Sequence, residues 1–270
     1  MNKKISFIET KEYKRFAEFC DACIKYQYIG ICYGLPGVGK TLSSRYYSNW
    51  DYIDQHLNYK TAPQVVETVD KKILDHQIVF YTAPAVRATR MTGDIERIAA
   101  KLNMVKTMYR VKTFGAEEKY SHNHFENISL IIVDEVDRLK MQGLEQLRDI
   151  YDQHELAIIF VGMPGIEKRL SRYPQLYSRI GFAHEFDRLS KDEAHHILEY
   201  KWHELGLSVR LEDFSDYEAI SNIIRITNGN FRLIHRLFAQ IERILEINNL
   251  QSISLDVVNA ARDSLTLGIK

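Results

Sequence analysis

The sequence has few cysteines, no long apolar run and no excess charge of either sign, and each absence excludes a class of protein. Three cysteines in 270 residues cannot build a disulfide scaffold and fit a reducing compartment, so we expect a cytoplasmic protein. Runs such as Leu130–Val133 and Ala157–Val161 are far shorter than the ~20 residues that a membrane-spanning helix needs. Met1–Lys4 leads into a mixed polar segment, so we expect neither a secretory signal nor a membrane partner. The 36 basic and 36 acidic side chains cancel, so any DNA binding must use a local patch.

The first two thirds of the chain alternate between short apolar runs and stretches of helical periodicity. Strands are predicted at Tyr28–Tyr33, Ile78–Thr82, Ile128–Val133, Leu156–Val161 and Phe182–Phe186. Helices are predicted within residues 10–26, at Leu42–Trp50, after Thr92-Gly93, and at Leu144–Tyr151 and Ile166–Ser171, whereas Asp51–Asp75 is ambiguous. Strands separated by helices predict an α/β fold with a parallel sheet between two helical layers, a three-layer sandwich.

The hydrophobic pattern of the sequence changes at Leu189. Ser190 is followed three residues later by Glu193, which is the pattern of a capping box at the start of a helix. No strand-like run follows, and helices are predicted at 191–205, 213–227, 230–248 and 254–265. We therefore expect two domains, an α/β nucleotide-binding domain over residues 1–188 and a small all-helical lid domain over residues 189–270.

Residues Gly34–Thr41 read GLPGVGKT and fit the phosphate-binding pattern G-x-x-x-x-G-K-[ST] between a strand and a helix. Glycines let the backbone curl so that successive N–H groups point at phosphate oxygens. The Lys40 ammonium reaches the β- and γ-phosphates, and the Thr41 hydroxyl ligates Mg²⁺. The pattern therefore predicts ATP and Mg²⁺ as cofactors, bound by Gly34, Pro36, Gly37, Val38, Gly39, Lys40, Thr41 and Leu42.

Two adjacent carboxylates, Asp134 and Glu135, follow the apolar run Leu130–Val133 that ends the third predicted strand. Neighbouring side chains at a strand end point in different directions, so the two carboxylates can have two different roles. Asp134 is predicted to hold the magnesium shell together with Thr41. Glu135 is predicted to polarise the attacking water as a general base.

The phosphate loop, the Asp-Glu strand end and the helical C-terminal domain together resemble the AAA+ ATPases. In this family the nucleotide lies between subunits, which implies further site residues. Leu176-Tyr-Ser-Arg179 resembles the motif whose arginine reaches the neighbouring subunit's γ-phosphate, with Arg172 as the nearest competitor. Asn228-Gly-Asn-Phe-Arg232 resembles the second sensor, in which a lid arginine touches the γ-phosphate, although Arg225 and Arg236 lie close. The resemblance thus implies an ATPase with Lys40, Glu135, Arg179 and Arg232 as catalytic residues.

The first sensor is where the sequence departs from the family. A polar Asn, Thr or Ser usually follows the strand at Ala157–Val161, whereas this chain has Gly162-Met163-Pro164. A thioether orients water poorly, so slow ATP turnover is expected while ATP binding is unaffected.

Within the AAA+ proteins, the chain resembles the transposition regulators of the Mu B, TnsC and TniB type. The resemblance rests on Val133–Leu139, Phe160–Gly162 and Tyr81–Pro84. It implies a regulator that uses ATP to assemble on double-stranded target DNA as a ring or helical filament. Such a regulator recruits or activates a transposase, in some cases with a target-selection protein, and ATP hydrolysis controls its disassembly. The open alternatives are a helicase-loader or clamp-loader-like remodeller and a nucleotide-dependent signalling switch.

A local basic patch is a candidate DNA contact. Residues 87–112 contain seven basic and two acidic side chains in a neutral protein. Such an excess can follow the phosphate backbone without reading bases. Lys106, Arg110 and Lys112 are the predicted DNA contacts. The alternative is a solvated helix face, on which Arg97 and Lys101 pair with nearby acids.

Overall fold

The computed structural model describes residues 7–57, 67–85, 90–115, 123–207 and 214–265. Within these residues, clustering of contacts divides the chain into two compact units. The sheet unit comprises Arg15–Gly34 and Lys40–Glu185, and the helical unit comprises Met1–Lys14, Leu35–Gly39 and Phe186–Lys270. The expected boundary at residues 188 and 189 stays a prediction, although the chain changes unit near it, between Glu185 and Phe186.

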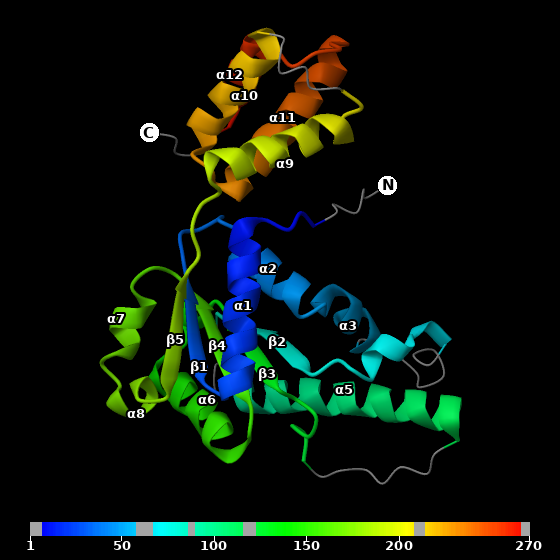
Figure 1. The fold of residues 1–270 in the computed structure, drawn as a ribbon, viewed down its shortest axis with the longest axis vertical. Coiled ribbons are helices and arrows are strands. Elements are labelled where there is room, and N and C mark those ends of the chain that lie inside the picture. Colours follow the sequence, from blue (N-terminus) through cyan, green and yellow to red (C-terminus); the bar gives the residue numbers. More distant parts are fainter. Residues whose placement is uncertain (1–6, 58–66, 86–89, 116–122, 208–213, 266–270) are drawn as a thin grey trace. The chain divides into compact units, whose positions relative to one another are not determined.

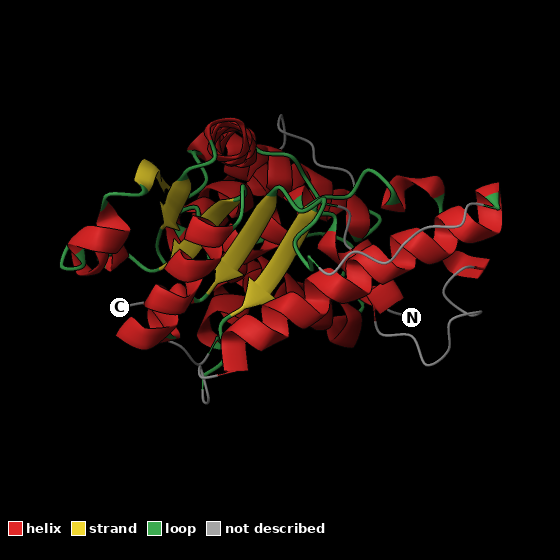
Figure 2. Ribbon diagram, turned by 90° about the horizontal axis from the view of Figure 1, so that it is seen from below, coloured by secondary structure: helices red, strands yellow, loops and turns green. Residues whose placement is uncertain are grey.

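The sheet unit contains five parallel strands in the order β2-β3-β4-β1-β5 (Figures 1 and 2). Their bounds are Ile29–Tyr33 for β1, Ile78–Thr82 for β2, Leu130–Asp134 for β3, Ala157–Gly162 for β4 and Ile180–Glu185 for β5. Every residue of β3 and β4 is buried, as expected for central strands covered on both faces. The predicted parallel α/β sheet is confirmed, with strand ends that differ from the prediction by up to two residues.

Helices cover both faces of this sheet (Figure 2). They are α1 (Lys11–Tyr26), α2 (Lys40–Tyr47), α3 (Trp50–Leu57), α5 (Met91–Phe114), α6 (Met141–Gln153), α7 (Ile166–Leu170) and α8 (Pro174–Tyr177), with 3₁₀ turns η1 (Lys71–Ile73) and η3 (Val136–Arg138). Helix α1 lies close against β1, because a Cβ on Gly30 would come within 2.5 Å of the Cys23 sulfur. The buried Cys20 and Cys23 therefore act as small apolar core residues.

Two helices differ from the prediction. The helix predicted at Leu42–Trp50 is α2, which ends at Tyr47, because Asn49 adopts a left-handed conformation with φ of 45°. Helix α3 follows and lies largely in the segment Asp51–Asp75 that the sequence leaves ambiguous. Helix α5 begins at Met91, so Gly93 lies inside its first turn, and it continues for 24 residues to Phe114. Gly115 ends it with φ of 64°, a left-handed cap that glycine adopts without strain.

The helical unit contains α9 (Lys191–Glu204), α10 (Phe214–Thr227), α11 (Phe231–Asn248) and α12 (Leu255–Asp263). The Ser190 side chain and the Glu193 side chain each bond the other's backbone N–H, so the predicted capping box is present. The four helices enclose an apolar core that includes Trp202, Ile223 and Phe238. No described helix is both long and apolar enough to cross a membrane.

Candidate functional site

The phosphate loop runs from the end of β1 to the start of α2, and its backbone has the curl that the motif predicts. Gly37 has φ of +83° and Gly39 has φ of +119°, conformations that L-residues with a Cβ rarely adopt. The Lys40 ammonium donates to the Gly34 carbonyl at 2.5 Å. Burial lowers the pKa of Lys40, while Cys32 and the carboxylate of Asp134 oppose that shift. The lysine is thus held at the loop, with acidic groups that favour its charged form.

The loop is tied to the end of β3 by one hydrogen bond. The Thr41 hydroxyl donates to Asp134 Oδ2 at 2.7 Å, although the two residues are 93 positions apart. Asp134 Oδ1 accepts from the Glu135 N–H at 2.9 Å. Burial raises the pKa of the Asp134 carboxyl, and the bonds from Thr41 and Glu135 partly oppose the increase. Burial of a carboxylate carries a desolvation cost, which these hydrogen bonds offset in part and which a bound cation would offset further.

These donors fit magnesium. Mg²⁺ prefers oxygen ligands and commonly takes one or two protein side chains, with phosphate oxygens and waters filling the rest of its shell. Thr41 and Asp134 supply one hydroxyl and one carboxylate. No cluster of three or more His, Cys, Asp or Glu side chains forms a metal site in the described part of the chain. The residues present therefore suit a magnesium ion carried by a nucleotide rather than a protein-only metal centre.

Glu135 follows Asp134 in a left-handed conformation, with φ of 56°, and begins the turn η3. Its carboxylate is 3.7 Å from the guanidinium of Arg138, which also donates to the Ala83 carbonyl at 3.0 Å. Ala83 directly follows β2, so Arg138 connects the ends of β2 and β3 next to Glu135. The Glu135 side chain is 44% exposed and can therefore meet water, as a general base must.

Asp137 is a residue of this region that the sequence analysis did not single out. Its Oδ2 accepts from the Met163 N–H at 2.7 Å, which fixes the loop after β4 against η3. A Cβ on residue 162 would come within 2.7 Å of that same oxygen, so a larger residue at this position would displace the Asp137 carboxylate. The sequence signal was Gly162 itself, at the end of an otherwise bulky strand. Met163 therefore presents its backbone to Asp137 at the position where the family usually has a polar side chain.

Arg179, the predicted trans-acting arginine, lies immediately before β5 and pairs with Asp152 of α6. Nε and Nη2 of Arg179 donate to the two carboxylate oxygens at 2.5 and 2.7 Å. This hydrogen bonding to Asp152 raises the pKa of the guanidinium. Arg179 is 31% exposed and remains charged, so it keeps the properties that a phosphate contact requires.

In the helical unit, the loop segment Leu35–Gly39 bonds to the start of α11. The Arg232 N–H donates to the Gly37 carbonyl at 3.0 Å, and Asn230 Nδ2 donates to the Pro36 carbonyl at 2.8 Å. Asn230 Oδ1 also accepts from the Leu233 N–H and so caps α11. Arg232 belongs to a motif that is visible in the sequence, whereas no local pattern indicates the contact of Asn230 with Pro36, which lies 194 positions away.

The predicted DNA contacts lie on α5, and one of them is wrong. Lys106 is 3% exposed, and its ammonium has no hydrogen-bond partner in the part of the chain that the structure describes. Burial lowers the pKa of Lys106 to about 8, with nearby Arg110 adding to the decrease. A buried ammonium cannot contact DNA phosphates, so Lys106 is not a DNA contact in this structure. Arg110 is half-buried and Lys112 is exposed, whereas Arg87 lies outside the described residues.

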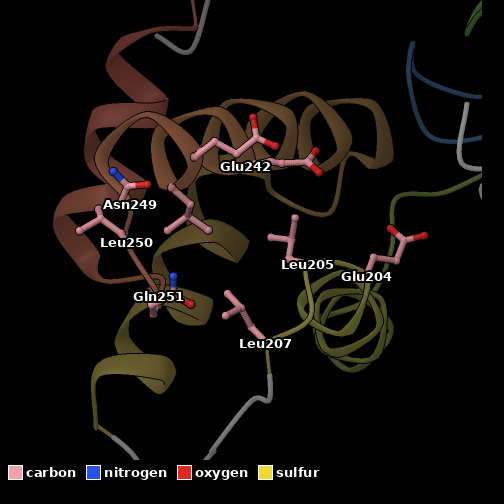
Figure 3. A pocket seen from close by; sticks show the side chains of 9 residues that line it. Glu204, Leu205, Leu207, Glu242, Asn249, Leu250 and Gln251 are labelled. Atoms are coloured by element: carbon pink, nitrogen blue, oxygen red, sulfur yellow. The ribbon is translucent and has the colours of Figure 1, made fainter. Parts of the chain in front are cut away.

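A pocket in the helical unit is separate from the phosphate loop (Figure 3). It lies at the C-terminal end of α11, whereas the loop segment bonds to the N-terminal end of the same helix. The pocket combines leucine side chains with carboxylates and amides and contains no predicted site residue. Its lining is Glu204, Leu205, Leu207, Glu242, Leu245, Glu246, Asn249, Leu250 and Gln251.

Comparisons with known proteins show the family of the chain. Residues 23–170 match a protein-family model described as an AAA domain. A Staphylococcus aureus protein named "Potential ATP-binding protein" is 62% identical over 271 residues, which cover 100% of each chain.

Three solved structures share the fold. The RuvB Holliday junction branch migration motor of Thermotoga maritima has a TM-score of 0.58 at 16% identity, over 97% of this chain and 72% of that chain. The Aeropyrum pernix ORC2 protein has a TM-score of 0.59 at 16% identity, over 98% of this chain and 72% of that one. The Aeropyrum pernix ORC1 protein in complex with DNA has a TM-score of 0.57 at 16% identity, over 98% and 68%.

Proposed function

This chain belongs to the AAA domain family, and from that premise we propose that it is a magnesium-dependent ATPase that assembles on DNA to regulate transposition. The observation that carries the proposal is the hydrogen bond from Thr41 to Asp134 at 2.7 Å. It brings the phosphate loop and the acidic end of β3 together, so the two residues that would hold Mg²⁺ lie side by side.

ATP binding uses groups of the loop itself. Backbone N–H groups around Gly37 and Gly39 face the phosphates, and Lys40 contributes a positive charge. The start of α2 at Lys40 adds the positive end of a helix. Thr41 and Asp134 hold Mg²⁺, which neutralises charge on the phosphates when it is bound.

Hydrolysis depends on Glu135. In the proposed mechanism the Glu135 carboxylate accepts a proton from the attacking water. The guanidinium of Arg138, 3.7 Å away, restrains the orientation of this carboxylate. Met163 supplies no polar side chain to help orient that water, so we expect turnover slow enough for the ATP-bound assembly to persist. Slow hydrolysis suits a switch, because the assembled state must last long enough to engage a partner.

Assembly depends on contacts that form only with the triphosphate. Arg179 of one subunit reaches the γ-phosphate bound by its neighbour, as the resemblance implies, and Arg232 contacts the γ-phosphate of its own subunit. The bond between the Arg232 backbone and Gly37 supports the second role, because it anchors α11 to the loop. Loss of the γ-phosphate removes both contacts and favours disassembly.

The DNA contact is proposed for Arg110 and Lys112, without Lys106. The structural likeness to an ORC1 protein solved in complex with DNA and to a branch migration motor supports a DNA partner for this chain. Each phosphate neutralised by the protein contributes about 0.9 to the slope of log affinity against log salt concentration. The Arg110→Gln/Lys112→Gln variant should therefore lower that slope by about 2 and leave ATP binding unchanged. A Lys168→Gln/Lys191→Gln variant, which removes two exposed charges elsewhere, serves as the control.

Electron microscopy with double-stranded DNA and a non-hydrolysable ATP analogue tests the proposed function. Regular filaments or rings that need both DNA and the analogue support it, and binding of a purified transposase to those assemblies supports the transposition role. Discrete rings that form without DNA would favour a loader-type remodeller. An ATP turnover rate that DNA leaves unchanged, with no assembly, would favour a signalling switch.

A further inference from the structure

The guanidinium of Arg179 is held from two sides within its own subunit. Its Nε and Nη2 donate to Asp152 at 2.5 and 2.7 Å, and its Nη1 donates to the Gln175 carbonyl. We propose that Asp152 is a positioning residue that fixes Arg179 in the orientation needed to reach a neighbouring subunit's phosphate. This inference rests on the proposed role of Arg179 in ATP hydrolysis across subunits.

The choice of nitrogen atoms matters for this role. An arginine side chain has five N–H donors, and the Nε–Nη2 side of the fork matches the two oxygens of a carboxylate. Asp152 occupies that side, and with the Gln175 carbonyl it uses three of the five donors. The Ser178 hydroxyl is a distant further acceptor, at 3.4 Å. Donors on the outer side of the guanidinium therefore remain for a phosphate oxygen.

A second arginine supports the residues that hold Arg179. Arg148, one turn before Asp152 on α6, donates to the Gln175 side chain and lies 3.8 Å from Asp152. It also pairs with Glu145 and Asp149, each at 3.0 Å. Asp152 and Gln175 are thus connected through Arg148, which joins α6 to α8. The carboxylate that holds Arg179 is itself restrained.

The backbone of Arg179 is fixed as well. Its carbonyl accepts from the Ile29 N–H at 3.1 Å, at the start of the central strand β1, and its N–H donates to the Leu176 carbonyl. Backbone and guanidinium are therefore both anchored to the sheet unit. Groups that are already oriented need no reorganisation when the transition state forms, which is the basis of electrostatic preorganisation.

Removal of Asp152 leaves Arg179 charged and long enough to reach a phosphate, but free to adopt many rotamers. The expected result is a lower kcat for ATP hydrolysis with an unchanged KM. If Asp152 were instead an inhibitory clasp that hides Arg179, its removal would raise turnover. The two interpretations therefore predict changes of opposite sign.

Mixed assemblies isolate this effect from the subunit's own ATP site. Arg179→Ala subunits keep an intact ATP site but lack the arginine, and Glu135→Gln subunits supply the arginine without hydrolysing ATP themselves. Turnover should return when the two are mixed. Donor subunits that carry both Glu135→Gln and Asp152→Ala should restore three- to tenfold less turnover than donors with Glu135→Gln alone. Donors with Glu135→Gln and Asp152→Asn should give an intermediate value, because asparagine keeps one acceptor oxygen.

Asp149→Ala in the donor is the matched control, because Asp149 pairs with Arg148 on the same helix and does not contact Arg179. It should restore turnover like the simple donor, and thermal melting should show that all donors are folded. Full or increased turnover with the Asp152→Ala donor would overturn the role of Asp152 while leaving the function of Arg179 intact. If the Arg179→Ala protein alone hydrolyses ATP at the parental rate, the assignment of Arg179 fails, and the inference about Asp152 fails with it.

Discussion

Gly37→Ala tests whether the phosphate loop is shaped by its contact with the start of α11. Gly37 has φ of +83°, and an added Cβ would lie 2.6 Å from Asn230 Oδ1 and 2.9 Å from Arg232 Cβ. A left-handed backbone costs a residue with a Cβ about 1–2 kcal/mol. The collision also displaces the bonds from Asn230 to Pro36 and from Arg232 to Gly37, each worth about 1 kcal/mol. The total loss of unfolding free energy should be about 3–4 kcal/mol.

The same distortion should weaken ATP binding. A loop whose binding-competent shape is disfavoured by about 2 kcal/mol loses roughly thirtyfold in affinity, since 1.4 kcal/mol is a factor of ten. Titration with a fluorescent ATP analogue measures the affinity, and urea unfolding measures the stability.

Gly165→Ala is the matched control for the collision. Gly165 has φ of +98° but no atom within 4 Å of an added Cβ, so alanine there incurs the backbone cost alone. It should lose about 1–2 kcal/mol of stability and bind ATP like the parent. If Gly37→Ala matches Gly165→Ala in stability and also keeps parental ATP affinity, the contact with α11 does not shape the loop and the reasoning is refuted.

Three further predictions concern the acidic strand end and a half-buried histidine. Glu135→Gln should retain ATP affinity while single-turnover hydrolysis falls at least a hundredfold, whereas hydrolysis within tenfold of the parent would assign the general base elsewhere. Burial raises the Asp134 pKa, so this carboxyl stabilises the fold when protonated and loses that contribution as the pH rises through its folded pKa. Without Mg²⁺ or nucleotide, Asp134→Asn should therefore unfold at a higher temperature than the parent at pH 7.5, and a lower melting temperature would contradict this. The same variant should lose Mg²⁺-dependent ATP affinity. Burial lowers the His76 pKa to about 4, so the unfolded chain binds more protons than the folded chain below pH 6.5. Stability should therefore fall by about 1 kcal/mol per pH unit between pH 6 and 4. His76→Gln should remove most of this dependence, and an unchanged slope would assign it to other groups.

Local patterns in the sequence were sufficient to predict a parallel sheet and the succession of strands and helices along the chain. The apolar runs at Ile78–Thr82 and Leu156–Val161 are strands because both faces of the sheet are covered, so nearly every residue is apolar. Strand and helix ends were less predictable. Asn49 divides α2 from α3 through its backbone conformation, and asparagine adopts that conformation often enough to give no clear signal in advance.

The site was predictable where its residues are neighbours in sequence. Lys40 and Thr41 follow directly from the loop pattern, and the position of Asp134 follows from the end of β3. Thr41 and Asp134 could be paired across 93 positions because both belong to motifs of known chemistry. Contacts between distant segments that carry no such motif could not be predicted. The bond from Asn230 to Pro36 and the pair between Asp152 and Arg179 both depend on how separate segments pack.

Lys106 shows the opposite failure. A positive side chain on a helix is usually solvated, and the basic excess of its neighbourhood favoured a DNA contact. In α5, Lys106 instead lies four residues after Leu102 and next to Val105, so the helical period places it on the buried face of the helix. Charge counts alone do not reveal which face of a helix a residue occupies.

The most direct test of the account is calorimetric titration of Mg-ATP into the parent and into Lys40→Ala. The parent should bind one nucleotide per chain, and the variant, which lacks the ammonium held at the Gly34 carbonyl, should show at least a hundredfold weaker binding while melting like a folded protein. Parental affinity in Lys40→Ala would contradict a phosphate site at this loop, and with it the ATPase and the assembly proposed here.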